Sequence, residues 1–191
     1  MTRLTADVVI CGAGIAGVSA AYHLSVKKGV TNILIVDDRP PLTLTSDKST
    51  ECYRNWWPGP SDVMVRFMNR SIDLLEGMAH ETDNILNLNQ RGYLFLTADT
   101  SGTQNLKDNA TLISRLGAGP LRVHDNLTNM QDYIRSPAQG FEDHPSGADL
   151  MLDRELIISQ YPFITDDVVA ALHARRCGCL LYTSPSPRDR G

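Results

Sequence analysis

The sequence predicts an α/β fold that opens with a strand–helix–strand unit and continues into a region of less regular strands and helices. A glycine-rich segment separates a short β-rich run from a helical pattern near the amino end. A second β-rich run follows within about thirty residues, which is the length of a βαβ unit. The regular alternation stops after residue 85, and this change predicts that an inserted or second domain begins there.

The first unit follows from its apolar pattern. Residues 7–11 (DVVIC) are a run typical of a buried parallel strand. Residues 15–28 repeat apolar side chains at helical spacing, and Gly29 ends that helix. Residues 32–36 (NILIV) predict a second buried strand, closed by Asp37.

The next segment, residues 39–60, is rich in proline and polar residues and shows no helical pattern, so we expect a long ordered loop. Ser61 is the expected N-cap of a helix over residues 63–79. Residues 89–98 predict a turn followed by an aromatic-rich strand.

The remaining elements are shorter. The pattern predicts helices over residues 103–116 and 153–161 and strands over 121–124 and 168–174. Residues 125–148 are polar and carry no clear pattern.

Composition excludes several classes of protein. The chain of 191 residues has a net charge of -4, which argues against a general nucleic-acid binder. The apolar run over residues 8–18 is interrupted by glycines and is too short to span a bilayer. The four cysteines lack paired metal spacing and favour a reducing, cytoplasmic setting, and the histidines share no metal-binding spacing, so we expect no metal.

The carboxyl end, CLLYTSPSPRD, has no helical or strand period. It resembles the translation of a sequencing adapter, although a natural tail rich in proline and serine is the alternative. We therefore expect residues 179–191 to be a non-native tail and the natural chain to continue beyond Gly178. No function is assigned after that residue.

The motif that indicates chemistry is G-x-G-x-x-G, made by Gly12, Gly14 and Gly17. The first glycine permits a tight turn, the second lets the backbone approach a diphosphate, and the third lets the helix pack closely on the sheet. Ile15 and Ala16 open the helix, whose amino end attracts phosphates. A glycine-rich turn without a ligand is the alternative.

An acid at the end of the second strand completes the fingerprint. Asp37 lies twenty residues after Gly17 and is expected to accept hydrogen bonds from the adenosine ribose, which disfavours NADP. Asp38 is the rival if the strand end shifts by one residue. FAD and NAD share this fingerprint, and the long loop after Asp37, in place of another helix and strand, favours FAD.

Longer segments resemble the D-amino-acid-oxidase-type FAD oxidoreductases, which include glycine oxidase, sarcosine oxidase and dimethylglycine dehydrogenase. The resemblance covers most of residues 7–178. The matching segments are DVVICGAGIAGVSAAYHL, ILIVD, TSDKSTECYRNWW, RGYLFLTA, LDRELIISQYPFI and ALHARRCG. It implies an incomplete FAD-binding Rossmann-like domain over residues 1–84 and the start of an antiparallel-sheet substrate domain over 85–178.

The resemblance also implies site residues. Its cofactor-contacting loop corresponds to Thr45, Ser46, Lys48, Ser49 and Thr50. Arg54 matches a basic position near the flavin, where it would stabilise negative charge on the reduced ring or steer a substrate carboxylate. The alternative for Arg54 is an arginine stacked on Trp56 or Trp57.

The implied reaction is oxidation of the C–N bond of a small amine or amino acid, by hydride transfer to the flavin, with dioxygen or an electron carrier as the final acceptor. Alternatives are a flavin-dependent dehydrogenase or electron-transfer protein with another substrate, or a non-catalytic accessory chain. Most catalytic residues are expected later in such proteins. We therefore expect these 191 residues alone to bind FAD poorly and to be inactive.

Overall fold

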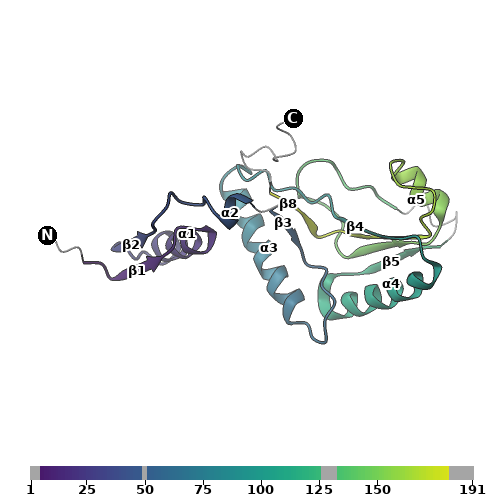
Figure 1. Ribbon diagram of the computed structural model, residues 1–191, viewed down its shortest axis with the longest axis horizontal. Helices are drawn as coiled ribbons and strands as arrows, with labels where there is room; N and C mark the ends of the chain where they lie inside the picture. The colour runs from purple at the N-terminus through teal and green to yellow at the C-terminus, as the bar shows by residue number, and fades with distance from the viewer. Residues whose placement is uncertain (1–4, 49–50, 126–132, 181–191) are drawn as a thin grey trace. The chain divides into compact units, whose positions relative to one another are not determined.

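The computed structural model describes residues 5–48, 51–125 and 133–180. The chain divides into two compact units, Met1–Thr50 and Glu51–Gly191 (Figure 1). Each unit is described by itself. The domain boundary expected near residue 85 stays a prediction, and of the expected non-native tail only Cys179 and Leu180 are among the described residues.

The first unit is the predicted βαβ arrangement. Strand β1 (Val8–Cys11) lies parallel to β2 (Ile33–Val36), and the helix α1 (Ile15–Tyr22) connects them. The helix continues as a π-helical turn, η1 (His23–Lys27), and the chain then turns at Gly29, whose φ is +71°. The local apolar pattern was sufficient to predict this unit.

The segment over residues 39–60 was expected to be a long ordered loop without helix or strand, and the absence of regular elements was wrong. This segment contains a short helix, α2 (Thr45–Lys48), and a strand, β3 (Cys52–Arg54). The strand pairs antiparallel with β8 (Cys177–Cys179). Because β3 exists through a partner far along the chain, its own three residues carry no pattern that predicts it.

Helix α3 (Val63–Glu81) is longer than the predicted helix over residues 63–79. The expected N-cap, Ser61, was wrong: Asp62 takes that position, and its side chain makes no capping hydrogen bond. The helix buries Ile72 and Ala79 completely, so packing within the second unit holds it in place.

A four-stranded sheet forms the centre of the second unit. Its strand order is β4 (Tyr93–Thr97), β7 (Ala170–Ala174), β6 (Ala148–Met151) and β5 (Leu121–His124). Neighbours are antiparallel except for β5 and β6, which are parallel. The sheet is therefore largely antiparallel, and β6 begins at the end of the stretch that showed no sequence pattern.

Helices pack against both faces of this sheet (Figure 1). Helix α4 (Thr100–Ile113) packs on the face that carries Leu150 and Leu172. Helix α5 (Arg154–Gln160), capped by the Asp153 side chain, packs on the other face. Side chains alternate between the two faces of a strand, so Asp149 and His173 share the α5 face.

Candidate functional site

The glycine turn between β1 and α1 has the geometry that the motif predicts. Gly12 has a φ of +105°, a conformation that side-chain-bearing residues rarely adopt. Its N–H donates to the Val36 carbonyl oxygen at 2.7 Å, which ties the turn to the end of β2. The turn therefore lies at the carboxyl ends of both parallel strands, where α/β sheets bind ligands.

Gly17 is required by close packing. A Cβ atom at this position would lie 1.9 Å from the Gly12 carbonyl oxygen and 3.3 Å from the Ile10 side chain. Only a glycine lets α1 approach β1 so closely. Ile15 and Ala16 begin α1 and are exposed, so the first turn of the helix faces outward.

The Asp37 carboxylate closes over this turn. The Ala13 N–H donates to its Oδ2 at 2.6 Å, and the Arg39 N–H donates to its Oδ1 at 3.0 Å. These two backbone donors, Ala13 first, lower the pKa of Asp37, so it is ionised at neutral pH. Each carboxylate oxygen retains a second lone pair that can accept a ribose hydroxyl.

The alternative acid, Asp38, does not contact the glycine turn in the described structure. Asp38 is 84% exposed, and its carboxylate contacts the Arg39 guanidinium at 3.8 Å. Of the two acids that the sequence offered, the structure brings Asp37 to the glycine turn.

A cavity of about 280 Å³ lies beside the turn. The loop after β2 folds back to form its wall, because the Leu42 N–H donates to the Ala13 carbonyl oxygen at 3.0 Å. The lining residues come from the turn and this loop: Gly12, Gly14, Asp37, Arg39, Pro40, Leu42, Thr43, Leu44 and Thr45.

The expected hydroxyl-rich loop is only partly described. Thr45 is exposed and lines the cavity, and Lys48 ends α2. The Ser46 side chain, and Ser49 and Thr50 altogether, lie outside the described residues. Their expected cofactor contacts stay predictions.

These features fit the ADP half of a dinucleotide. Gly12 and Gly14 line the cavity and carry no Cβ atom, so a ligand can approach their backbone. A helix begins at this turn, and the ionised Asp37 carboxylate lies at the end of the second strand. Fold and site together define a dinucleotide-binding protein of the Rossmann-like class.

The family is shown by comparison with known proteins. Residues 7–182 match the model of the DAO family, described as FAD dependent oxidoreductase, and the chain belongs to this family. No curated protein matches the chain significantly.

Solved structures share the fold. A glycine oxidase from Bacillus cereus superposes with a TM-score of 0.66 at 13% identity, covering 92% of this chain and 41% of that one. An FAD-bound L-α-glycerophosphate oxidase from Mycoplasma pneumoniae gives 0.66 at 15% identity, covering 93% and 39%. A modified fructosyl peptide oxidase from Aspergillus nidulans gives 0.58 at 16%, covering 94% and 36%. The chain thus spans about two fifths of the length of these relatives.

Arg54 belongs to the second unit. Its guanidinium lies 4.0 Å from the centre of the Trp57 ring, the stacking that the sequence offered as an alternative. Its Nε and the Nε1 of Trp56 are buried and have no hydrogen-bond partner among the described residues. Both side chains line an apolar cavity of about 230 Å³.

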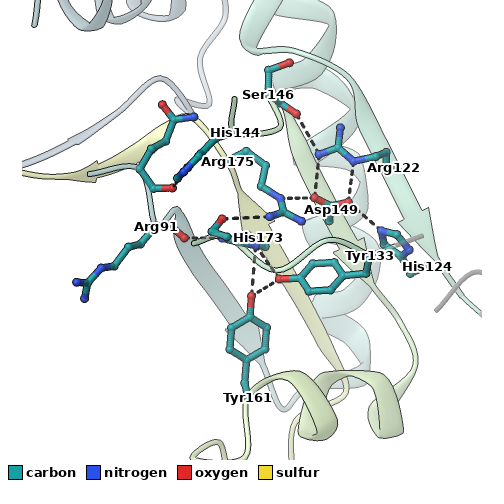
Figure 2. Close-up of polar contacts among 12 residues, drawn as sticks. Arg91, Arg122, His124, Tyr133, His144, Ser146, Asp149, Tyr161, His173 and Arg175 are labelled. Carbon is teal, nitrogen blue, oxygen red and sulfur yellow. Dashed lines mark hydrogen bonds and ion pairs between the residues drawn. The ribbon is translucent and has the colours of Figure 1, made fainter. Parts of the chain in front are cut away.

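Sequence reasoning missed a network of charged and polar groups on the α5 face of the sheet (Figure 2). Asp149, 1% exposed, accepts hydrogen bonds from Arg122 at 2.7 and 2.8 Å, from His124 at 2.9 Å and from Arg175. Burial raises the pKa of Asp149, but the bonds from Arg122 and His124 and the charge of Arg175 outweigh it and lower that pKa.

The network extends to His173, which pairs with Asp149 across the sheet. Its Nε2 lies 2.9 Å from the Arg91 carbonyl oxygen and therefore carries the proton. Its Nδ1 accepts from the Tyr133 hydroxyl at 2.8 Å, and the Tyr161 hydroxyl contacts both (Figure 2). Burial, and then the charge of Arg175, lower the pKa of His173 to about 4.

A polar residue inside an otherwise apolar strand was the available signal. Asp149 interrupts ADLM and His173 interrupts AALHA. Neither motif shows that the two residues are neighbours, because their pairing depends on the order of strands in the sheet. Within the described part of the chain, no group of acidic, histidine or cysteine residues is arranged to hold a metal, and no helix is long and apolar enough to cross a membrane.

Proposed function

We propose that the protein is an FAD-dependent enzyme that oxidises the carbon–nitrogen bond of a small amine or amino acid. The observation that carries the cofactor assignment is the Asp37 carboxylate, hydrogen-bonded to the glycine turn beside a cavity. The likeness in fold to glycine oxidase and fructosyl peptide oxidase supports the substrate class. A cytoplasmic location and dioxygen or an electron carrier as acceptor belong to the same proposal.

The residues of the first unit would bind the nucleotide end. The Asp37 carboxylate would accept hydrogen bonds from the ribose hydroxyls, while the backbone of Gly12 and Gly14 would lie against the diphosphate. Thr45 lines the same cavity, and its hydroxyl would donate to a phosphate oxygen. When bound, FAD supplies the acceptor for the electron pair that leaves the substrate carbon as hydride.

Arg54 is our candidate for binding a substrate carboxylate. A buried N–H without a partner costs about 1–3 kcal/mol, and two such donors, on Arg54 and Trp56, line one cavity. Phe95 and Leu172 supply apolar lining there. An anionic group on a small apolar body would satisfy both the donors and the lining.

Oxidation of a carbon–oxygen bond is the second candidate. The L-α-glycerophosphate oxidase superposes with the same TM-score as the glycine oxidase from Bacillus cereus. The likeness in fold therefore supports oxidation of either bond.

The test is an anaerobic absorption spectrum of the longer protein that is expected to contain residues 1–178, expressed without the adapter-like residues 179–191. We expect bleaching of the flavin bands on addition of glycine, sarcosine or dimethylglycine. Bleaching by glycerol 3-phosphate alone would favour the second candidate. A colourless protein that takes up no FAD would contradict both.

A further inference from the structure

A second cavity, of about 560 Å³, lies in the second unit beside His173. Its lining combines arginines, a serine and apolar or aromatic side chains: Arg91, Arg135, Ser136, Pro137, Ala138, Tyr161, Phe163 and His173. We propose that this cavity binds a small organic carboxylate with an aromatic or aliphatic body.

The surroundings of the cavity are electropositive. Among the described residues, Asp149 is the one carboxylate in the buried network, and it faces two guanidinium groups, those of Arg122 and Arg175. Arg175 is only 1% exposed, so its charge is poorly screened by water. The network therefore places excess positive charge behind the cavity wall.

This buried charge reaches the cavity through a hydroxyl group. Arg175 Nη1 donates to Ser136 Oγ at 3.1 Å, and Ser136 lines the cavity. Because the Ser136 oxygen accepts from a cation, its own O–H is available to donate, and it is polarised toward an anion.

Two arginines on the cavity lining supply the direct charge. Arg91 Nε donates to the Ala138 carbonyl oxygen at 2.6 Å, which holds the side chain while the terminal nitrogens remain as further donors. Arg135 forms no ion pair within residues 5–48, 51–125 and 133–180. The guanidinium fork matches the geometry of a carboxylate, which it can bind through two parallel hydrogen bonds.

Another part of the wall is uncharged and held in place by hydrogen bonds. His173 is neutral at physiological pH, and its ring is held between the Arg91 carbonyl and the Tyr133 hydroxyl (Figure 2). Tyr161 contacts this group and packs edge-on against Phe163, with ring centres 6.1 Å apart. Phe163 is 77% exposed, so a ligand body that covers it would remove apolar surface from water.

The test uses phenylacetate and its neutral analogue phenylacetamide, each titrated into the ¹⁵N-labelled chain without flavin. We expect phenylacetate to shift the backbone amide signals of Ser136, Ala138 and Phe163 saturably. Phenylacetamide should bind at least about tenfold more weakly, because it lacks the charge that the arginines recognise. Equal shifts by both probes, or no saturable shift, would overturn the proposal.

Variants of two arginines test whether phenylacetate binds in this cavity. Arg135→Gln should weaken phenylacetate binding about tenfold, and Arg135→Lys should restore part of the loss. Arg115→Gln removes an exposed arginine that does not line the cavity and should bind as the unaltered chain does. Unchanged binding by Arg135→Gln would count against the site. Since no flavin is present, neither result depends on the proposed oxidation.

Discussion

At the scale of single residues, we expect Gly→Ala substitutions at Gly17 and Gly77 to have opposite effects on the free energy of unfolding. Gly17→Ala would place a Cβ 1.9 Å from a backbone oxygen, whereas an added Cβ at Gly77, inside α3, meets no atom within 4 Å. We expect Gly17→Ala to destabilise the first unit by about 1–3 kcal/mol or more. Gly77→Ala should stabilise α3 by up to about 1 kcal/mol. Urea denaturation followed by the amide signals of each unit measures both.

Arg54 permits a kinetic prediction for the proposed oxidation. If its guanidinium binds a substrate carboxylate, Arg54→Gln should raise KM about tenfold or more, with a smaller change in kcat. The measurement is steady-state kinetics with sarcosine on the longer, FAD-loaded protein of the spectral test, with Arg115→Gln as the control variant. A loss confined to kcat would point instead to a role at the flavin, the other function that the resemblance implied.

At the scale of elements, the sheet depends on a buried charge. Arg122, Asp149 and His173 lie in register on β5, β6 and β7. Asp149→Asn would leave Arg175 buried without a counter-charge, and we expect a loss of about 3–5 kcal/mol in the free energy of unfolding. Replacing Arg175 as well, with Asp149→Leu and Arg175→Met, should recover part of that loss, because Arg175 is then no longer an unpaired buried charge while Arg122 and His124 still lack their acceptor. Equal destabilisation by the single and double variants would contradict this account.

The same elements predict how stability depends on pH. The folded-state pKa of His173 is lowered to about 4, so the unfolded chain binds more protons below its ordinary pKa of about 6.5. The His173 contribution is therefore present above about pH 6.5 and is lost as the pH falls toward 4. The lowered pKa of Asp149 adds a second loss, which begins below about pH 4.

Unfolding free energies measured between pH 7.5 and 3 check this prediction. His173→Gln should flatten the slope between about pH 6.5 and 4 and leave the fall below pH 4. An unchanged slope in this variant would show that other groups titrate in that range.

At the scale of the whole molecule, the hydrophobic pattern of the sequence predicted the elements whose formation depends on neighbouring residues. The run DVVIC, the three glycines and NILIV were enough to predict the βαβ unit and the position of Asp37. Strand β3 and the network around Asp149 were missed, because both depend on pairing between segments far apart in the chain. No local periodicity reports that Arg122, Asp149 and His173 are neighbours.

The sheet of the first unit also makes a prediction. Among the described residues it consists of β1 and β2 alone, so each strand has one edge without a strand partner. We expect the 191-residue chain to bind FAD weakly and to purify without stoichiometric flavin. A yellow protein with one flavin per chain would contradict this expectation.

The central claim is that the glycine turn and Asp37 hold the ADP half of FAD. Titration of ADP into the ¹⁵N-labelled chain, followed by NMR, tests it most directly. We predict weak but saturable shifts at the amides of residues 12–17, about tenfold weaker binding for Asp37→Asn, and unchanged binding for Asp38→Asn. Shifts that avoid the turn, or an affinity that Asp37→Asn leaves unaltered, would contradict the account.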